Sequence, residues 1–175
     1  MDTSLAALVS SLKQLFIELK PNRSTFSFLL LIGKKDQGKS TLLSQSTLKH
    51  LEVSTERGCE IYYNTNGIIL EFSEEWIQQT DTLLEQALKH IEKAHHALSI
   101  TGLLLAIDAN PLFMSDPITL PSDALIHTKL LQRFSKALGR PLPLALIFTK
   151  LDGVAGFSDF FQNDSLVEQK KPLGF

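Results

Sequence analysis

The sequence is poor in features that define several large classes of protein. Its 175 residues include a single cysteine, Cys59, which excludes an internal disulfide framework and fits a reducing compartment. No apolar run approaches the ~20 residues needed to cross a bilayer, and the first residues lack a basic segment followed by a cleavage site. The chain as given is therefore expected to be soluble, with Cys59 as a small buried residue.

The sequence also lacks an excess of charge of either sign. It has 17 Lys and Arg against 19 Asp and Glu, a formal net charge of -2, so nucleic-acid binding has no support from charge. Three histidines, His90, His95 and His96, have no acidic or cysteine partners at metal-ligand spacing, so we assign no metal to them. A hydrophobic content of 43% is enough for one domain with a core.

What the sequence does contain is a phosphate-binding pattern in a suitable setting. An apolar run over residues 26–32 is followed at once by G-x-x-x-x-G-K-S at residues 33–40 and then by a helical pattern. Gly33 and Gly38 let backbone N–H groups face an anion, and the following helix adds its positive end. Lys39 would reach the outer phosphates, and the Ser40 hydroxyl would be a Mg²⁺ ligand. The residues predicted to bind phosphate are Gly33, Lys34, Lys35, Asp36, Gln37, Gly38, Lys39, Ser40 and Thr41.

Apolar spacing along the rest of the chain predicts alternating helices and strands. The expected helices cover residues 5–19, 40–48, 74–98 and 122–138, and the expected strands cover residues 26–32, 61–63, 68–70, 102–108 and 142–148. Asn66-Gly67 predicts the turn of a hairpin, and Ser73 and Ser122 are the expected N-caps of the two long helices. The order of elements predicts a three-layer α/β P-loop domain, GTPase-like, on a mostly parallel sheet with an antiparallel hairpin edge.

The domain organisation follows from the same pattern. We expect an N-terminal amphipathic helix within residues 1–22 and the P-loop domain over residues 25–175. No closing strand and helix follow the last predicted strand, so the domain is expected to be truncated at its C-terminal end. Residues 111–121 are predicted as a loop. The inner face of the helix after it is predicted to consist of Ala124, Leu125, Thr128, Leu131, Phe134 and Leu138.

Three predicted strands end in residues that should meet at one edge of the sheet. Gly33, Asp108 and Thr149 each follow the carboxyl end of a strand, where open α/β sheets bind ligands. Asp108 has two open interpretations, a cap at the end of its strand or a metal ligand of the Walker-B kind. The polar stretch 50–58 is where a nucleotide switch would lie, and Thr55 within it is a candidate Mg²⁺ ligand.

Thr149-Lys150-Leu151-Asp152 resembles the guanine-reading [N/T]-K-x-D motif of P-loop GTPases. In that motif the carboxylate accepts hydrogen bonds from the guanine ring N–H and the exocyclic amine, and the lysine stem lies along the base. The resemblance implies that Thr149, Lys150 and Asp152 bind guanine. The motif follows a core strand about 110 residues beyond Lys39, as GTPases require.

A second GTPase motif, D-x-x-G, is altered. At its expected place Leu70 is followed by Glu71-Phe72-Ser73-Glu74. Glu71 is longer than aspartate, and Glu74 puts a carboxylate where the backbone N–H of a glycine would contact the γ-phosphate. No glutamine is evident for positioning water, so no catalytic residue is assigned. We expect nucleotide binding to survive and fast hydrolysis and switching to be lost.

From Phe26 onward the chain resembles the cytoplasmic P-loop domain of the IcmF/TssM family, large inner-membrane components of bacterial type IV and type VI secretion systems. The resemblance rests on the phosphate pattern and on the segments around Cys59 and Tyr62-Tyr63, Gly67 to Leu70, Thr101 to Leu104, Leu142 to Asp152, and Gly156 to Phe161. The departures from the family pattern, Glu71 and Glu74 among them, favour the type IV, IcmF-like branch.

This resemblance implies a protein of the bacterial inner membrane, with this domain on the cytoplasmic side and the membrane-spanning segments outside this chain. It also implies a small DotU-like inner-membrane partner, other secretion-system components, and GTP or GDP with Mg²⁺ as ligand. Two functions remain open. In the first, which the altered D-x-x-G favours, the domain stabilises the secretion complex, with at most weak guanine-nucleotide binding and little hydrolysis. In the second, it is an active GTPase or ATPase that powers or switches the apparatus.

Overall fold

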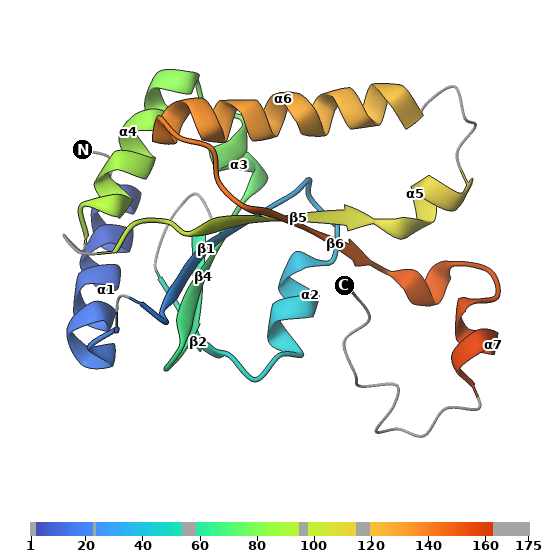
Figure 1. The fold of residues 1–175 in the computed structure, drawn as a ribbon, viewed down its shortest axis with the longest axis horizontal. Helices are drawn as coiled ribbons and strands as arrows, with labels where there is room; N and C mark the ends of the chain where they lie inside the picture. The colour runs from blue at the N-terminus through green and yellow to red at the C-terminus, as the bar shows by residue number, and fades with distance from the viewer. Residues whose placement is uncertain (1–2, 23, 54–58, 95–97, 115–119, 163–175) are drawn as a thin grey trace.

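The computed structural model describes residues 3–22, 24–53, 59–94, 98–114 and 120–162. This part of the chain forms a six-stranded sheet in the order β2-β3-β4-β1-β5-β6 (Figure 1). The strands are β1 (Ser27–Ile32), β2 (Lys49–Leu51), β3 (Cys59–Asn64), β4 (Gly67–Phe72), β5 (Gly102–Asp108) and β6 (Leu144–Thr149). The helices are α1 (Thr3–Leu19), α2 (Lys39–Ser44), α3 (Glu74–Ile77), α4 (Asp81–Glu92), α5 (Ala109–Met114), α6 (Leu120–Leu138), the 3-10 turn η1 (Leu151–Gly153) and α7 (Phe157–Phe161).

The pairing of the strands confirms the predicted α/β fold. β1 lies between β4 and β5 and is parallel to both, and β5 is parallel to β6. β3 is antiparallel to β2 and to β4, so the antiparallel strands form one edge of the sheet. The central strand β1 is a continuous apolar run, as expected for a strand covered on both faces.

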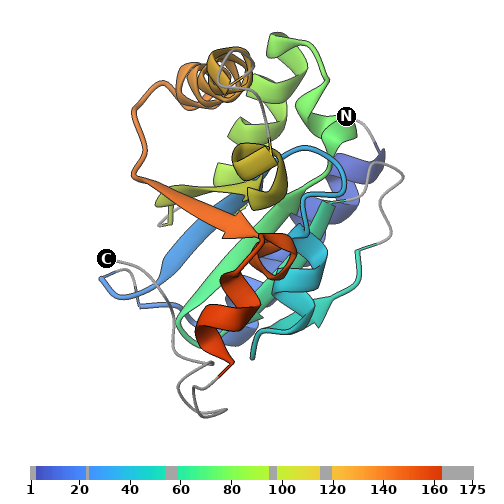
Figure 2. The same ribbon diagram turned by 90° about the vertical axis from the view of Figure 1, so that its right-hand side faces the viewer.

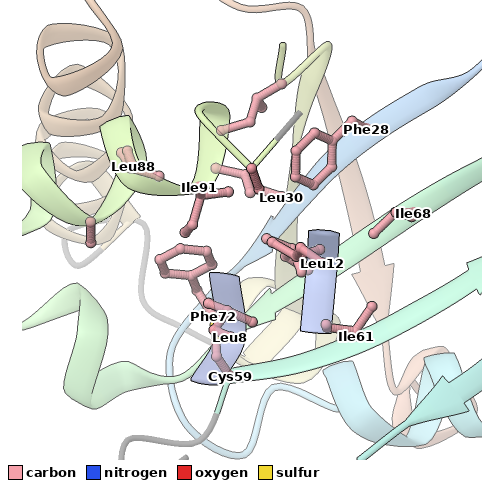
Figure 3. Close-up of a cluster of buried hydrophobic side chains, with 14 of the residues drawn as sticks. Leu8, Leu12, Phe28, Leu30, Cys59, Ile61, Ile68, Phe72, Leu88 and Ile91 are labelled. Carbon is pink, nitrogen blue, oxygen red and sulfur yellow. The ribbon is translucent and has the colours of Figure 1, made fainter. Parts of the chain in front are cut away.

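The larger hydrophobic core lies on the face of the sheet that α1, α4 and α6 cover (Figure 3). Alternate residues of β1 point into it, because side chains of a strand alternate between the two faces. Leu12 of α1 and Leu30 of β1 are both fully buried there, and each such burial stabilises the fold by about 1.5–3 kcal/mol. The buried apolar residues of α1 recur at helical spacing, as predicted, namely Leu5, Leu8, Val9, Leu12, Leu15 and Phe16, and Ser4 is also buried.

The opposite face of the sheet carries a smaller core. Leu31 of β1, Leu43 of α2, Tyr62 and Ala106 form it, and α2 lies on the opposite side of the sheet from α4 and α6 in both views (Figures 1 and 2). β6 is the strand at the end of the sheet order, and its residues are mostly exposed along its length. The central strands are thus buried by their neighbours in the structure, whereas β6 remains largely exposed to solvent.

The hairpin is confirmed, but its turn differs from the predicted one. Thr65 and Asn66 are the two central residues, and the side-chain oxygen of Asn64 accepts hydrogen bonds from the backbone N–H groups of Asn66 and Gly67 (2.7 and 3.0 Å). Gly67 already belongs to β4, where a Cβ atom would lie 2.6 Å from the carbonyl oxygen of Ser27. The glycine is therefore needed for the close approach of β1 and not for the turn.

The predicted helix over residues 74–98 is wrong in its length, because the chain forms two helices, α3 and α4. The guanidinium of Arg133 in α6 donates hydrogen bonds to the carbonyl oxygens of Ile77 and Gln79 (2.6 and 2.5 Å), where α3 ends. Thr80 then caps α4, its hydroxyl accepting a hydrogen bond from the N–H of Leu83 (3.4 Å). A side chain from a distant helix thus stabilises the break.

Three further boundaries differ from the prediction. The helix predicted over residues 40–48 ends at Ser44, and the strand β2 extends into the polar stretch 50–58, for which no strand was predicted. The predicted loop over residues 111–121 contains α5, and α6 begins at Leu120 rather than after Ser122. Its predicted inner face is wrong in its first half, since Ala124, Leu125 and Thr128 are exposed.

Cys59 is fully buried in the larger core, as predicted. None of the helices in the described ranges is long and apolar enough to cross a membrane.

Candidate functional site

The loop over residues 33–38 connects the central strand β1 to α2. Gly38 precedes α2 with a φ of 74°, a left-handed conformation that glycine adopts without strain. A Cβ atom at Gly38 would lie 3.3 Å from the Cβ of Thr149, so the loop passes close to the end of β6. The side-chain oxygen of Gln37 accepts a hydrogen bond from the N–H of Lys34 across the loop (2.6 Å). The loop is therefore held in a closed turn by its own residues.

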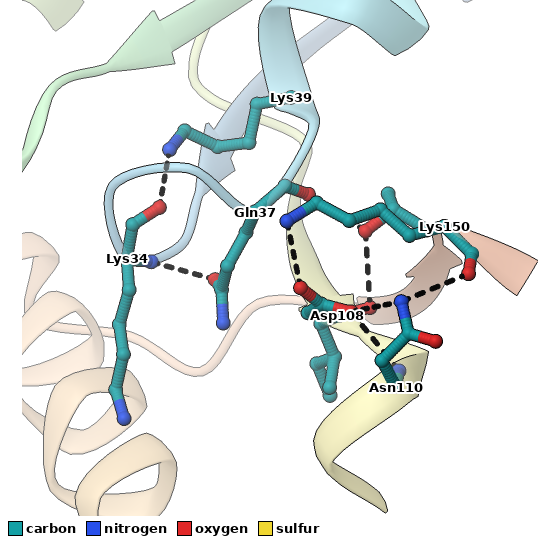
Figure 4. A network of polar contacts seen from close by, with 8 residues as sticks. Lys34, Gln37, Lys39, Asp108, Asn110 and Lys150 are labelled. Atoms are coloured by element: carbon teal, nitrogen blue, oxygen red, sulfur yellow. Dashed lines mark hydrogen bonds and ion pairs between the residues drawn. The ribbon is translucent and has the colours of Figure 1, made fainter. Parts of the chain in front are cut away.

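The side chain of Lys39 folds back over this loop (Figure 4). Its ammonium donates hydrogen bonds to the carbonyl oxygens of Lys34 (2.8 Å) and Gly33 (3.2 Å), and the residue is only 6% exposed. Burial lowers the pKa of Lys39, while the nearby carboxylates, Glu71 first among them, act in the opposite direction. A cation is thus placed at the end of the loop that joins β1.

A buried carboxylate lies beside the first turn of α2. Ser40 donates a hydrogen bond from its hydroxyl to one carboxylate oxygen of Glu71, at 3.0 Å. The second oxygen of Glu71 is buried and has no hydrogen-bond partner within the described residues. Burial raises the pKa of Glu71, although the hydrogen bond from Ser40 and the charge of Lys39 oppose that shift. Nowhere in the described ranges do three or more His, Cys, Asp or Glu side chains gather in an arrangement that would hold a metal ion.

Glu74, in the first turn of α3, contacts the loop directly. One of its carboxylate oxygens accepts a hydrogen bond from the backbone N–H of Lys35 (3.2 Å). The other accepts one from the side-chain amide of Gln78 (3.1 Å), one helical turn further along. The carboxylate is therefore held in place from two sides.

Thr149 joins the loop to the segment after β6. Its hydroxyl donates a hydrogen bond to the carbonyl oxygen of Gln37 (2.6 Å) and lies 3.2 Å from that of Ile107, and the residue is 8% exposed. Lys150 follows with a φ of 54°, in the left-handed region that lysine seldom adopts. Asp152 lies in the exposed turn η1.

Asp108 is hydrogen-bonded to the segment that follows β6. Its carboxylate accepts a hydrogen bond from the ammonium of Lys150 (2.7 Å) and one from the backbone N–H of Asn110 (3.0 Å), the latter as at a helix start (Figure 4). Partial burial opposes ionisation, but these hydrogen bonds hold the pKa of Asp108 below its ordinary value. The amide of Asn110 also donates to the carbonyl oxygen of Lys150 (3.3 Å). The contacts favour the cap interpretation of Asp108 over a metal ligand.

An open cleft of about 470 Å³ lies over the loop. It is lined by Lys35 to Thr41, by Glu71, by Ser73 to Glu75, and by Lys150. Four predicted site residues do not line it, namely Gly33, Lys34, Thr149 and Asp152. Thr149 instead contacts the loop through its hydrogen bond to the carbonyl oxygen of Gln37. Thr55, the other candidate Mg²⁺ ligand, lies outside the described residues, as do His95 and His96. Asn110 carries no signal in the sequence beyond its position two residues after a strand-terminal aspartate.

The family model described as the IcmF-related N-terminal domain matches residues 74–175, a range that begins at Glu74 and includes the Thr149 to Asp152 segment. Among curated proteins, no sequence match of significance was found. A solved structure with a similar arrangement is the small COPII coat GTPase SAR1 of Encephalitozoon cuniculi, described as an ADP-ribosylation-factor-like GTP-binding protein and crystallised in complex with GDP. It is 14% identical, the match covers 87% of this chain and 82% of that one, and the TM-score is 0.34, too low to bear on ligand or activity.

Proposed function

The chain belongs to the IcmF-related N-terminal domain family, and from that premise we propose that it is the GTPase-like domain of a bacterial secretion-system component. In this role it stabilises the secretion complex, binds guanine nucleotide weakly and hydrolyses it little. Two carboxylates beside an otherwise complete phosphate loop carry the proposal. Glu71 accepts a hydrogen bond from the hydroxyl of Ser40, and Glu74 accepts one from the backbone N–H of Lys35.

Each part of the nucleotide has candidate partners, most of them on the cleft, with Asp152 outside its lining. The backbone N–H groups of the loop and the ammonium of Lys39 would bind the phosphates. Lys150 and Asp152 would bind the guanine base, with Thr149 fixing their position through its bond to the loop. The buried ammonium of Lys39, hydrogen-bonded to the loop carbonyls of Gly33 and Lys34, supports this assignment.

The residues beside Lys39 fit a magnesium ion. Hydroxyl and carboxylate oxygens are the ligands that Mg²⁺ prefers, and Ser40 and Glu71 present both within 3.0 Å of each other. The buried second oxygen of Glu71, without a partner among the described residues, supports the fit. When bound, Mg²⁺ would neutralise phosphate charge. Ser40 would hold the ion directly through its hydroxyl oxygen, and Glu71 would hold it through its carboxylate.

Weak binding follows from the contacts that a nucleotide would have to replace. The ammonium of Lys39 would have to leave two carbonyl oxygens, and polyphosphate would enter a cleft that Asp36, Glu71, Glu74 and Glu75 also line. Like charges about 4 Å apart near a protein surface repel by roughly 4 kcal/mol. Little hydrolysis follows from the absence of a side chain assigned to orient water.

An active GTPase or ATPase is the second candidate. Lys39, Ser40 and Asp152, which such an enzyme needs, are all present. The ATPase version also needs Asp108 as a metal ligand, whereas Asp108 is paired with Lys150 and does not line the cleft over the loop.

Calorimetric titration with GTP, GDP and ATP in Mg²⁺ tests the proposal. We expect micromolar or weaker binding that prefers guanine and is lost in Lys39→Ala and in Asp152→Asn. Absence of binding to every nucleotide would remove the ligand part of the proposal, and robust Mg²⁺-dependent turnover abolished by Lys39→Ala would establish the second candidate instead.

The proposed setting is the cytoplasmic side of the inner membrane, with membrane-spanning segments outside this chain and a DotU-like protein among the partners. Copurification of the full-length protein with that partner from detergent-solubilised inner membranes is the expected result. Recovery of the full-length protein in the soluble fraction without it would contradict this setting.

A further inference from the structure

The two ends of the phosphate loop are not equivalent. In phosphate loops the lysine reaches the outer phosphates of the nucleotide, while the residues at the helix start contact the inner ones. Here the ammonium of Lys39 lies against the carbonyl oxygens of Gly33 and Lys34, at the end of the loop that joins β1. That end of the cleft is therefore where an outermost phosphate would lie.

Glu74 binds the loop at this same end. Its carboxylate accepts the hydrogen bond of the Lys35 N–H, the next residue along from the carbonyl of Lys34 that holds Lys39. The other carboxylate oxygen is fixed by Gln78, so the group is aimed at the loop rather than free in solvent. Its negative charge also acts on the Lys39 ammonium. A carboxylate thus holds a loop N–H that an outer phosphate would seek, and its charge acts on the loop lysine as the charge of a phosphate would.

We propose that the Glu74 carboxylate stands in the place of the outermost phosphate, so that the site takes nucleoside diphosphates and discriminates against triphosphates. This inference rests on the proposed function and names the ligand class of that same site.

The physical basis is competition between the Glu74 carboxylate and a phosphate oxygen for the backbone N–H of Lys35. A backbone N–H that is bonded to a carboxylate oxygen is not available to a phosphate oxygen, and two anions in contact repel each other. A diphosphate would use the part of the loop nearer α2, from Gly38 to Ser40, and would leave the contact between Glu74 and Lys35 intact. A triphosphate would have to displace it. We expect wild-type affinity for GDP to exceed that for GTP by about tenfold or more.

Glu75 provides a matched control for charge. It also lines the cleft, next to Glu74 in the same helical turn, and its charge also acts on Lys39. No hydrogen bond between its side chain and the loop is among the contacts of the described residues. Glu75→Gln therefore changes the net charge of the cleft as Glu74→Gln does and leaves the Lys35 contact in place.

The experiment titrates GDP and GTP, and inorganic pyrophosphate and tripolyphosphate, into four proteins in the presence of Mg²⁺. The proteins are the wild type, Glu74→Ala, Glu74→Gln and Glu75→Gln. We expect Glu74→Ala to raise affinity for GTP and tripolyphosphate about tenfold and to change GDP and pyrophosphate less than twofold. Glu74→Gln should give a smaller gain, because its amide oxygen can still accept from Lys35, and Glu75→Gln should leave the ratio of GTP to GDP affinity unchanged.

The outcomes separate this inference from the proposed function. Equal affinity of the wild type for GDP and GTP, or an equal gain for both in Glu74→Ala, overturns the inference and leaves guanine-nucleotide binding standing. Tripolyphosphate binding by Glu74→Ala when the wild type binds no nucleotide supports the role of the carboxylate and overturns the proposed ligand. Absence of binding in all four proteins overturns both.

Discussion

In the half of the proposed site that would face phosphate, Lys39 and Glu71 are 6% and 7% exposed and are hydrogen-bonded within the protein. In the half that would face the base, Lys150 and Asp152 are exposed and Thr149 is the buried member. We call these the phosphate half and the base half. The phosphate half follows the central strand β1, with neighbours on both sides, and the base half follows β6, at the end of the sheet order. The fold itself therefore shapes the phosphate half, whereas the charged side chains of the base half remain open to solvent.

Gly33→Ala, in the phosphate half, should have the largest effect on the difference between the two halves. A Cβ atom there would lie 2.9 Å from the carbonyl oxygen of Ala106 and 2.6 Å from the side-chain oxygen of Gln37, so the backbone of the phosphate half must shift. We expect a loss of about 3 kcal/mol in the free energy of unfolding, measured by urea titration. The control is Gly139→Ala, where no atom lies within 4 Å of the added carbon and a φ of 68° alone should cost about 1 kcal/mol. Equal losses in the two variants would show that the phosphate half is not tightly built.

Thr149→Val should have the next largest effect, because it cuts the link between the halves. Valine keeps the shape of threonine but leaves the buried carbonyl oxygen of Gln37 without its donor, at a cost of about 2 kcal/mol. Thr128→Val, on an exposed part of α6, should cost less than about 0.5 kcal/mol. Chemical denaturation of both variants makes the measurement. A Thr149→Val protein as stable as wild type would mean that the halves are independent.

Glu71→Gln should have a smaller effect of opposite sign. Because burial raises the pKa of Glu71, the carboxyl group stabilises the fold when protonated, and that stability is lost as pH rises from the ordinary pKa of 4.5 through the raised native value. The glutamine variant lacks this titration, so at pH 7 it should be about 1 kcal/mol more stable than wild type. Urea unfolding of both proteins from pH 4 to pH 8 isolates the difference. Parallel curves across this range would contradict a raised pKa.

The smallest effect is expected for Asp108→Asn in the base half. The lowered pKa of Asp108 means that its contribution is present above the ordinary value of 3.8 and is lost as pH falls through the lowered one. Because Lys150 is 41% exposed in its side chain, solvent screens the pair, and we expect a loss of about 0.5 kcal/mol at pH 7. Thermal melts at low and high salt check this. A loss as large as that of Thr149→Val would place Asp108 among the structural residues.

The fold could be predicted where the signal was local. Apolar runs identify β1, β5 and β6, and helical spacing identifies the buried residues of α1, because a strand or helix that faces a core needs a regular pattern. The break between α3 and α4 could not be predicted, since the apolar spacing continues across Gln78 to Thr80 and the contacts that stabilise it come from Arg133 in α6. α5 was missed because Pro111 was interpreted as part of a loop, yet proline is tolerated in the first turn of a helix.

The same distinction holds for the site. The loop residues were identified from a contiguous motif, and Glu74 from its spacing after β4, and Glu74 and the loop residues from Lys35 onward line one cleft. The ion pair of Asp108 with Lys150 and the role of Asn110 depend on the parallel pairing of β5 with β6. A local sequence pattern does not predict this pairing. The exposed first half of α6 was also beyond prediction, because apolar residues there suggest burial whether or not a neighbour is present.

The bond between Thr149 and Gln37 joins residues that are 112 positions apart, and the bonds of Ser40 to Glu71 and of Lys35 to Glu74 span 31 and 39 positions. During folding, contacts of such long sequence separation form against the entropy of closing large loops, and parallel sheets assemble slowly for this reason. The contact between Lys34 and Gln37 is local, whereas we expect the bonds that fix the turn over residues 33–38 from outside to form late, once β4 and β6 have joined the sheet. A partly folded chain would carry the same motif without these supports.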